Sequence, residues 1–232
     1  MLLDAPESIK NLKIKEVEDL IAAIGKVTAD SGAAITAAEK KYNALSEVEK
    51  ASVKNAKTIE EAKKQLTAAI KEKGKKLLSS FKKDADAVTG NTFYYPRTMR
   101  FYGEYWAADI RCFALPYIGV KGDSTWLRFL VNYTGDNWVF FEKIIFSVDG
   151  ENTTKYFSYY DVTRDNGGGD VWEYVDIPVG DSEIELLREI ADSKTTIVRF
   201  QGDDYRHDFT ITQADKNAIK EILLAYDSLT AE

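Results

Sequence analysis

The sequence contains one cysteine, Cys112, and one histidine, His207. A lone cysteine excludes an internal disulfide framework and any metal site built from several thiolates. One cysteine and one histidine cannot form a zinc site without several carboxylates, so we expect no zinc site, and no sequence motif predicts a cofactor. Any catalytic triad, dyad or general base that needs an imidazole would have to use His207. No Gly-x-Ser-x-Gly elbow or other nucleophile signature accompanies it, so we expect His207 to be a surface or turn residue and the protein to be non-catalytic.

Long hydrophobic runs are also missing. No segment approaches the roughly 18 consecutive apolar residues that a membrane-spanning helix needs. Residues 1–4 are too short to form a signal peptide, so we expect either a cytoplasmic protein or one whose leader has been removed. The formal net charge is −7, and no run of Lys and Arg carries interleaved aromatic residues, so we expect no nucleic-acid partner.

The composition changes near Gly90. Only two of the 28 aromatic residues and none of the eight arginines precede it. Residues 1–90 carry 17 Lys against 14 Asp and Glu, a net charge of +3, whereas residues 91–232 carry a net charge of −10. The first part is rich in Ala and Lys with helical periodicity, and the second holds short runs of aromatic and β-branched residues typical of strands. We therefore expect two domains, residues 1–90 and residues 91–232.

Residues 1–90 show the signals of a small helical bundle. Apolar residues recur at helical spacing in three segments, residues 17–24, 35–45 and 59–81. Gly25 is a stop signal for the first helix. Ser46 with Glu49, and Thr58 with Glu61, have capping-box spacing, which predicts the start of a short helix and of the long third one.

One series of positions within this bundle follows a recognisable pattern: Ile21-x-x-Ile24-Gly25-x-Val27-Thr28, then Ser31, Ile35, Ala38, Tyr42, Leu45, Lys50, Val53, Asn55 and Ala62. The pattern resembles the short helical modules of secreted and surface-anchored proteins of Gram-positive bacteria, and the likeness covers residues 17–66. It implies an extracellular or cell-surface location and a spacer or stalk role, with no catalytic residues to carry over. This chain departs from the pattern in having one copy, and Lys73-Gly74-Lys75 is expected to interrupt the long helix.

Strand periodicity begins after residue 91. Residues 127–133 and 138–148 alternate on either side of a turn at Thr134-Gly135-Asp136-Asn137, which predicts a β-hairpin with Trp138 and Phe140 in its core. Truncation of either ring to Ala is then expected to cost about 3 to 5 kcal/mol. Further strands are expected in four other segments, near residues 111–117, 156–160, 171–177 and 196–200.

Two helices interrupt or close this region. Asp181 or Ser182 would cap the first, and Thr212 with Asp215 would open the second. We therefore expect an α+β fold: an N-terminal small helical bundle followed by a mostly antiparallel β-sandwich or curved sheet with a C-terminal helix. Residues 196–212 resemble tails of uncharacterised bacterial envelope proteins, a likeness that implies no particular activity.

Acidic residues offer two kinds of candidate site. Asp165 and Asp170 flank Asn-Gly-Gly-Gly, so this loop is either a glycine-rich connection or a calcium site, although it lacks EF-hand spacing. Carboxylate pairs for sugar hydrolysis can be drawn from four acids, as in almost any acidic protein: Glu104, Asp109, Glu142 and Glu173. Glu142 would be either buried among aromatic neighbours or paired with Arg128 or Lys143.

Aromatic residues are more numerous after residue 91 than a core of that size hides, so we expect some to be exposed. The residues considered are Tyr94, Tyr95, Tyr102, Tyr105, Trp106, Trp126, Tyr159, Tyr160, Trp172 and Tyr174. Exposed rings stack on sugar faces or anchor protein interfaces, although sheet faces and edges also prefer Tyr and Trp. The ligand-binding patch that we predict consists of Tyr156, Tyr160, Trp172 and Tyr174.

Three functions remain open. The leading hypothesis is a non-catalytic secreted or surface-attached bacterial protein, in which a helical spacer presents an aromatic-rich β domain to a carbohydrate or protein ligand. The second is an enzyme that acts on extracellular carbohydrate, and the third is a structural envelope component without a small ligand. A groove rimmed by Trp and Tyr would favour sugar binding, whereas a flat or convex face would favour the structural role.

Overall fold

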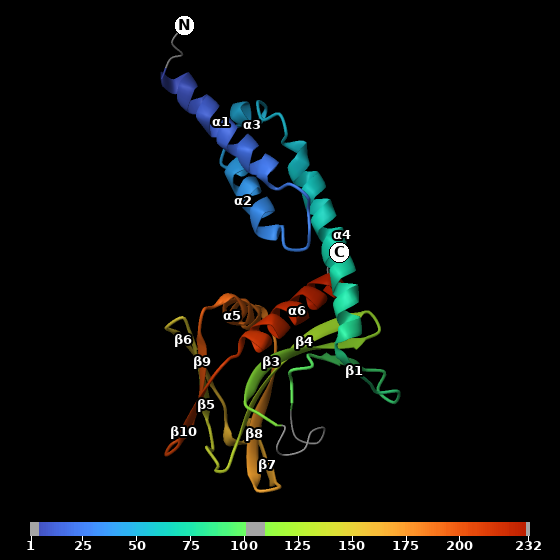
Figure 1. The fold of residues 1–232 in the computed structure, drawn as a ribbon, viewed down its shortest axis with the longest axis vertical. Helices are drawn as coiled ribbons and strands as arrows, with labels where there is room; N and C mark the ends of the chain where they lie inside the picture. Colours follow the sequence, from blue (N-terminus) through green and yellow to red (C-terminus); the bar gives the residue numbers. More distant parts are fainter. Residues whose placement is uncertain (1–4, 101–109, 231–232) are drawn as a thin grey trace. The chain divides into compact units, whose positions relative to one another are not determined.

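The computed structural model describes residues 5–100 and 110–230 and shows an α+β protein (Figure 1). The chain divides into two compact units, one of residues 1–75 with 227–232 and one of residues 76–226. We call them the helical unit and the sheet unit. The expected fold class, N-terminal helices followed by a curled, mostly antiparallel sheet and a C-terminal helix, is confirmed.

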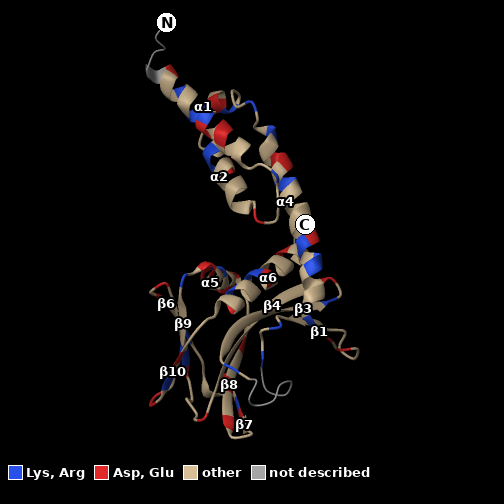
Figure 2. Cartoon of the chain, in the orientation of Figure 1, with Lys and Arg blue, Asp and Glu red and all other residues tan. Residues whose placement is uncertain are grey.

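The helical unit contains α1 (Ala5–Ala23), α2 (Gly32–Asn43), the one-turn α3 (Glu47–Lys50) and most of α4 (Lys57–Ser80). Its core contains the apolar side chains at the predicted helical spacing and, in addition, Val53 between α3 and α4: Val17, Ile21, Ile24, Ile35, Ala38, Leu45, Val53, Ile59 and Ala62. Charged residues, coloured blue and red in Figure 2, recur along α1, α2 and α4 between the apolar positions. Lys41 pairs with Glu16 at 2.6 Å and Lys63 with Glu39 at 2.8 Å, and such solvent-exposed pairs contribute little to stability.

The ends of these helices follow the local sequence signals in part. Gly25 follows α1 with φ +59°, and Ser46 and Glu49 form the predicted capping box. The capping box predicted at Thr58 is wrong, because α4 already begins at Lys57 and the Thr58 N–H donates to the carbonyl of Asn55 (3.0 Å). The expected interruption at Gly74 is absent as well, since α4 continues through it.

Two antiparallel sheets make up the sheet unit. The first has the order β1-β2-β3-β4-β8-β7 and the second the order β10-β9-β5-β6. Their strands are β1 (Lys82–Ala85), β2 (Thr92–Tyr95), β3 (Phe113–Lys121), β4 (Ser124–Gly135), β5 (Lys143–Val148), β6 (Glu151–Tyr156), β7 (Thr163–Gly167), β8 (Asp170–Pro178), β9 (Thr196–Gln201) and β10 (Arg206–Thr210). The strands expected near residues 111–117, 171–177 and 196–200 are confirmed as β3, β8 and β9. Because β1 precedes residue 90, the sheet begins ahead of the break in composition.

Helices α5 (Asp181–Asp192) and α6 (Gln213–Thr230) lie at one end of the two sheets (Figure 1). The buried Lys216 of α6 donates to the carbonyl of Ser193, just after α5, at 3.1 Å. Thr212 and Asp215 cap α6 as predicted, whereas Gly180 rather than Asp181 or Ser182 is the N-cap of α5.

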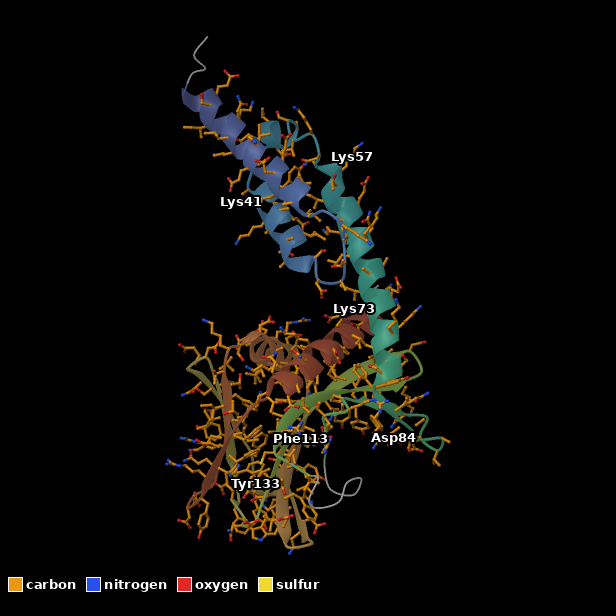
Figure 3. The ribbon with its side chains drawn as sticks, in the orientation of Figure 1. Lys41, Lys57, Lys73, Asp84, Phe113 and Tyr133 are labelled. Carbon is orange, nitrogen blue, oxygen red and sulfur yellow. The ribbon has the colours of Figure 1, made fainter. Side chains whose placement is uncertain are left out.

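Aromatic rings fill the space between the two sheets. The ring centroids of Phe129 and Phe146 lie 5.7 Å apart, and those of Tyr133 and Phe200 lie 5.7 Å apart. Tyr133 is labelled among the side chains of the sheet unit in Figure 3. The core is therefore an interdigitated face-to-face packing of two sheets, to which α5 and α6 add aliphatic side chains.

The predicted hairpin of residues 127–148 is wrong. β4 pairs with β3 and β8, whereas β5 pairs with β6 and β9, so the two segments belong to different sheets. Residues 136–142, which we call the crossing segment, connect them without forming a strand. Within it Phe140 adopts φ +51° and is 45% exposed, and Trp138 is only partly buried, while Val139 and Phe141 are buried. The prediction failed because it assumed that side chains alternate between two faces along residues 138–148, and residues 138–142 are not an extended strand.

The strand expected near residues 156–160 is also wrong. β6 ends at Tyr156, and residues Tyr159–Asp161 form the 3₁₀ turn η2. Ser158 caps this turn, since its N–H and hydroxyl both donate to the carboxylate of Asp161. Polar capping by Ser and Asp favours a turn over continued strand pairing.

Glu183 makes the stability of the sheet unit depend on pH. Its carboxylate accepts hydrogen bonds from Lys155 of β6 and from the N–H of Gly180 (2.9 Å). The Lys155 hydrogen bond, assisted by that of Gly180 and opposed by burial, lowers the pKa of Glu183 from 4.5 to about 2.

A carboxyl whose pKa is lower in the folded state stabilises the fold above its unfolded pKa and loses that contribution as the pH falls through its folded pKa. We therefore expect Glu183→Gln to destabilise the protein at neutral pH, and the difference from the unmodified protein to shrink between pH 4.5 and about pH 2. Urea denaturation of both proteins across this range measures the effect. A difference that does not change with pH would contradict it.

Candidate functional site

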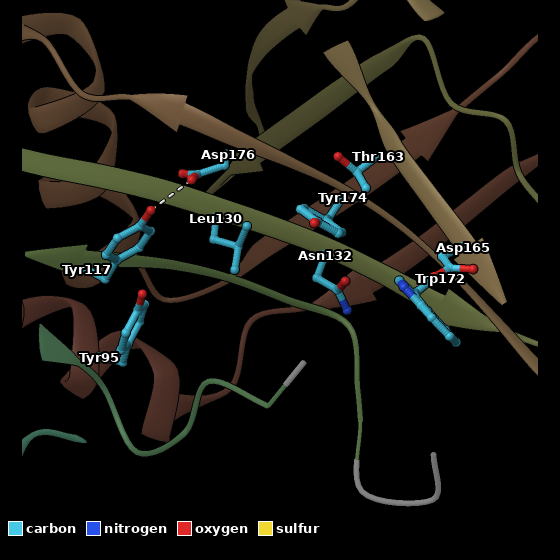
Figure 4. A pocket seen from close by; sticks show the side chains of 9 residues that line it. All are labelled: Tyr95, Tyr117, Leu130, Asn132, Thr163, Asp165, Trp172, Tyr174 and Asp176. Atoms are coloured by element: carbon cyan, nitrogen blue, oxygen red, sulfur yellow. Dashed lines mark hydrogen bonds between the residues drawn. The ribbon is translucent and has the colours of Figure 1, made fainter. Parts of the chain in front are cut away.

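One face of the curled six-stranded sheet carries a pocket of about 350 Å³ (Figure 4). Its lining comes from five strands: Tyr95, Tyr117, Leu130, Asn132, Thr163, Asp165, Trp172, Tyr174 and Asp176. Antiparallel register puts these side chains on one face, since Tyr174 of β8 lies opposite Asn132 of β4 and opposite Thr163 of β7. The volume falls in the range of about 300 to 1,000 Å³ that small-ligand sites occupy.

At one end of the pocket the polar groups are paired with one another. The Tyr117 hydroxyl donates to Asp176 Oδ2 at 2.7 Å, drawn as a dashed line in Figure 4, and Arg128 Nε donates to Oδ1 at 3.1 Å. The centroids of the Tyr95 and Tyr117 rings lie 4.8 Å apart. Burial raises the pKa of Tyr95 to about 12, and burial together with the Asp176 carboxylate raises the pKa of Tyr117 well above its usual value. Both phenols therefore stay protonated, and this end offers ring surface beside a neutralised carboxylate.

At the other end the pocket offers polar atoms without partners in the part of the chain that the structure describes. Asn132 Nδ2 donates to the carbonyl of Arg111 (3.0 Å), which leaves Oδ1 with no donor among the described residues. The hydroxyls of Thr163 and Tyr174 make no hydrogen bond within the same part of the chain. Asp165, opposite Trp172 in the β7–β8 register, accepts one hydrogen bond there, from the N–H of Asn166 (2.8 Å). At this open end a ligand can reach the exposed Thr163 and Asp165, whereas Asn132 is 2% exposed.

Buried charges on the opposite face of β8 hold this end in place. Glu173 lies between Trp172 and Tyr174 and points into the core, where it is 0% exposed. Its carboxylate accepts hydrogen bonds from three consecutive N–H groups of residues 139–141 and from Arg164 Nε (3.2 Å). Arg164 of β7 also donates to three backbone carbonyls. The network ties β7, β8 and the crossing segment together, and so fixes the two strands that carry the open end.

The four residues predicted as a ligand-binding patch do not form one exposed surface. Trp172 is 4% exposed and Tyr174 is partly buried, and both line the pocket. Tyr156, 76% exposed, ends β6 in the other sheet, and Tyr160, 94% exposed, lies in η2. Neither of these two residues lines the pocket. The prediction grouped the four residues because alternation along the sequence does not reveal which strands share a sheet.

Sequence reasoning missed most of the pocket. Asp176 continues the alternation of Trp172 and Tyr174 along β8 and was detectable on that basis. Asn132 and Tyr117 reach the pocket only through strand pairing between distant segments. Tyr102, Tyr105 and Trp106, also considered as exposed rings, lie outside the described residues.

The acidic residues considered for sugar hydrolysis do not form a pair of catalytic carboxyl groups among the described residues. Glu142 is exposed, and Arg128 pairs with Asp176 rather than with it. Glu173 is buried in its ion pair with Arg164. Glu104 and Asp109 lie outside the described residues.

The loop of residues 165–170 is the tight connection between β7 and β8. Gly168 (φ +66°) and Gly169 (φ +99°) both adopt the left-handed conformation that a two-residue hairpin turn requires. Across residues 5–100 and 110–230, no group of three or more His, Cys, Asp or Glu side chains is placed to hold a metal ion. The geometry therefore fits the glycine-rich connection.

The single cysteine and the single histidine meet in the fold. Cys112 Sγ lies 3.7 Å from Nε2 of His207, which is partly buried at the start of β10. Burial raises the pKa of the Cys112 thiol, and the thiol donates to the carbonyl of Thr134 (3.4 Å). Nucleophilic catalysis needs a thiolate, and burial favours the protonated form of this thiol.

No described helix has the length and apolar character needed to cross a membrane. Comparison of the chain with models of protein families, with curated proteins and with solved structures finds no match.

Proposed function

We propose that the chain is a non-catalytic secreted or cell-surface bacterial protein, in which the sheet unit binds a saccharide in its pocket and the helical unit is a spacer. The observation that carries the binding role is the pocket, where the partly buried Tyr174 lies opposite the exposed Thr163, whose hydroxyl has no partner among the described residues. Saccharides need both elements, because their C–H faces pack on aromatic rings while their hydroxyls take hydrogen bonds. The extracellular setting is supported by the resemblance of residues 17–66 to modules of secreted proteins.

Two features favour binding over the alternatives. A pocket lined by Trp and Tyr supports a small ligand, whereas a purely structural component would present a flat or convex face. Hydrolysis of a glycosidic bond uses two carboxyl groups, and here Asp176 is paired with Arg128 and Tyr117. Asp165 is then the one carboxylate of the described lining that forms no ion pair.

A glycan array combined with a reducing-sugar release assay tests this function. We expect retention of one saccharide class without release of reducing ends. Release would show an enzyme, and an array without any bound glycan would overturn the proposal.

Tyr174→Ala is expected to weaken saccharide binding about tenfold or more, because the ring supplies stacking area and its hydroxyl a hydrogen bond. Isothermal titration with the glycan retained on the array measures the change. Tyr160→Ala is the matched control, since it removes the same side chain from a fully exposed position outside the pocket. Equal effects of the two substitutions would contradict the assignment of the site.

A further inference from the structure

Exposed aromatic rings gather where the crossing segment meets η2. Phe140, Tyr159 and Tyr160 are 45%, 60% and 94% exposed, so a partner can reach their rings. Trp138 stacks on Phe140 with ring centroids 5.5 Å apart, and Tyr159 meets Tyr160 edge to face at 5.7 Å. Arg164 joins these two pairs, because its guanidinium carbon lies 5.9 Å from the ring centre of Phe140 and 4.5 Å from that of Tyr159. We call the four rings the ring series, and exposed rings in mutual contact are typical of interaction surfaces.

The backbone that carries the ring series is fixed by one buried ion pair. The N–H of Phe140 donates to Glu173 Oε1 at 2.8 Å, and the carbonyl of Tyr159 accepts from Nη1 of Arg164, the partner of Glu173, at 2.9 Å. Phe140 also adopts φ +51°, which is strained for a residue with a side chain and persists only where the surrounding structure enforces it. Such residues cluster at functional sites. The rings are therefore set in place before a partner binds, which lowers the entropy cost of binding.

Carboxylates without ion pairs lie along the same surface. The crossing segment contributes two exposed acids, and the turn between β9 and β10 contributes two more. This turn packs on the crossing segment, since Gly202 lies so close to the carbonyls of Val139 and Phe140 that a side chain would not fit there. None of the four acids forms an ion pair within the described part of the chain. We call them the rim carboxylates: Asp136, Glu142, Asp203 and Asp204.

The cations of these segments leave the surface acidic. Arg164 is already balanced by Glu173, whose carboxylate lies 3.2 Å from its Nε. Lys143 and Arg206 directly follow the crossing segment and the turn, so residues 136–143 and 202–206 together hold four acids and two bases. A partner that presents phosphates or carboxylates would meet net repulsion here, whereas a cationic partner would be attracted.

We infer that the ring series and the rim carboxylates form a docking surface for a protein or peptide segment that presents arginine side chains. Guanidinium groups stack on aromatic faces and also pair with carboxylates. Arg164 shows this arrangement inside the fold, since it lies on the ring of Tyr159 and pairs with Glu173. The surface shares no residue with the pocket of the sheet unit, so the inference is independent of the saccharide proposal.

NMR titration of the whole isotope-labelled chain tests the docking surface with three synthetic peptides of equal length, in which Gly alternates with Arg, Lys or Glu. We expect the Arg peptide to shift the backbone amides of Phe140, Tyr160 and Asp204, and to bind about threefold more tightly than the Lys peptide. The Glu peptide is expected not to bind. Equal affinity for the Arg and Lys peptides, or shifts that lie elsewhere in the chain, would overturn the inference.

Two substitutions at Tyr160 separate the role of the ring from that of apolar area. Tyr160→Leu keeps an apolar side chain without a π face and is expected to weaken binding of the Arg peptide about threefold. Tyr160→Phe keeps the ring and is expected to bind as the unmodified protein does. Tyr160 is almost fully exposed, so neither substitution disturbs the core. Equal affinity of the Leu and Phe variants would contradict stacking on this ring.

Two double variants of equal charge separate the surface from the net charge of the protein. Glu142→Gln with Asp204→Asn removes two rim carboxylates and is expected to weaken binding of the Arg peptide about threefold or more. Asp123→Asn with Glu151→Gln is the matched control, because these exposed acids lie at the far ends of β4 and β5 from the crossing segment. We expect this control to change the affinity by less than about 1.5-fold. Equal losses in the two double variants would overturn the inference.

Discussion

Glu173→Ala is expected to lower the free energy of unfolding by about 3 to 5 kcal/mol. The side chain is fully buried and the Arg164 side chain is 9% exposed, so the substitution leaves an uncompensated guanidinium inside the sheet unit. It also removes the acceptor from the N–H groups of residues 139–141. Each buried donor left without a partner costs free energy, in addition to the stranded charge.

Glu142→Ala provides the matched control. It removes the same side chain from an exposed position in the crossing segment, and a surface substitution of this kind changes stability by less than about 0.5 kcal/mol. Urea denaturation followed by circular dichroism measures both variants. A cost below about 1 kcal/mol for Glu173→Ala would mean that the network does not hold the crossing segment.

Phe141→Ala is expected to cost about 3 to 5 kcal/mol, whereas Phe140→Ala is expected to cost less than about 1 kcal/mol. Phe141 is 0% exposed, and its ring centroid lies 5.1 Å from that of Phe200. Phe140 is 45% exposed, and its positive φ is strained for a residue with a side chain. This order is the reverse of the one that strict alternation through residues 138–148 predicts.

Thermal and urea denaturation of the two single variants test this order. A larger cost at Phe140 than at Phe141 would restore the alternating arrangement and contradict the crossing segment described above. Phe140→Gly tests the strain at this position, because glycine adopts positive φ without strain. We expect this variant to be at least as stable as Phe140→Ala.

Sequence reasoning succeeded where the determining contacts are local. The apolar stripe of Val17 and Ile21, the capping box of Ser46 and the cap of α6 at Thr212 each depend on residues within one or two helical turns. Such features repeat at 3.6-residue spacing and can be read directly. The α+β class followed from them and from the strand-like runs after residue 91.

The sheet pairing and the pocket depend on contacts between distant segments. The N–H of Val139 finds its acceptor on Glu173, 34 residues further along the chain, and nothing near Val139 indicates this partner. Trp172 and Tyr174 were selected as aromatic residues, but their neighbours Asn132 and Tyr117 are set by the order of strands β3, β4 and β8. The sequence identified Asp165 only as a possible calcium ligand. Its place in the pocket follows from the register of β7 with β8, in which it lies opposite Trp172.

Chemical-shift mapping by NMR tests the central claim most directly. The isotope-labelled chain is titrated with the glycan that the array retains, and the backbone amides that shift are identified. We expect the shifts to gather on β4, β7 and β8 around Asn132, Asp165 and Tyr174. Shifts confined to the helical unit, or to the surface around Tyr156 and Tyr160, would contradict binding in the pocket.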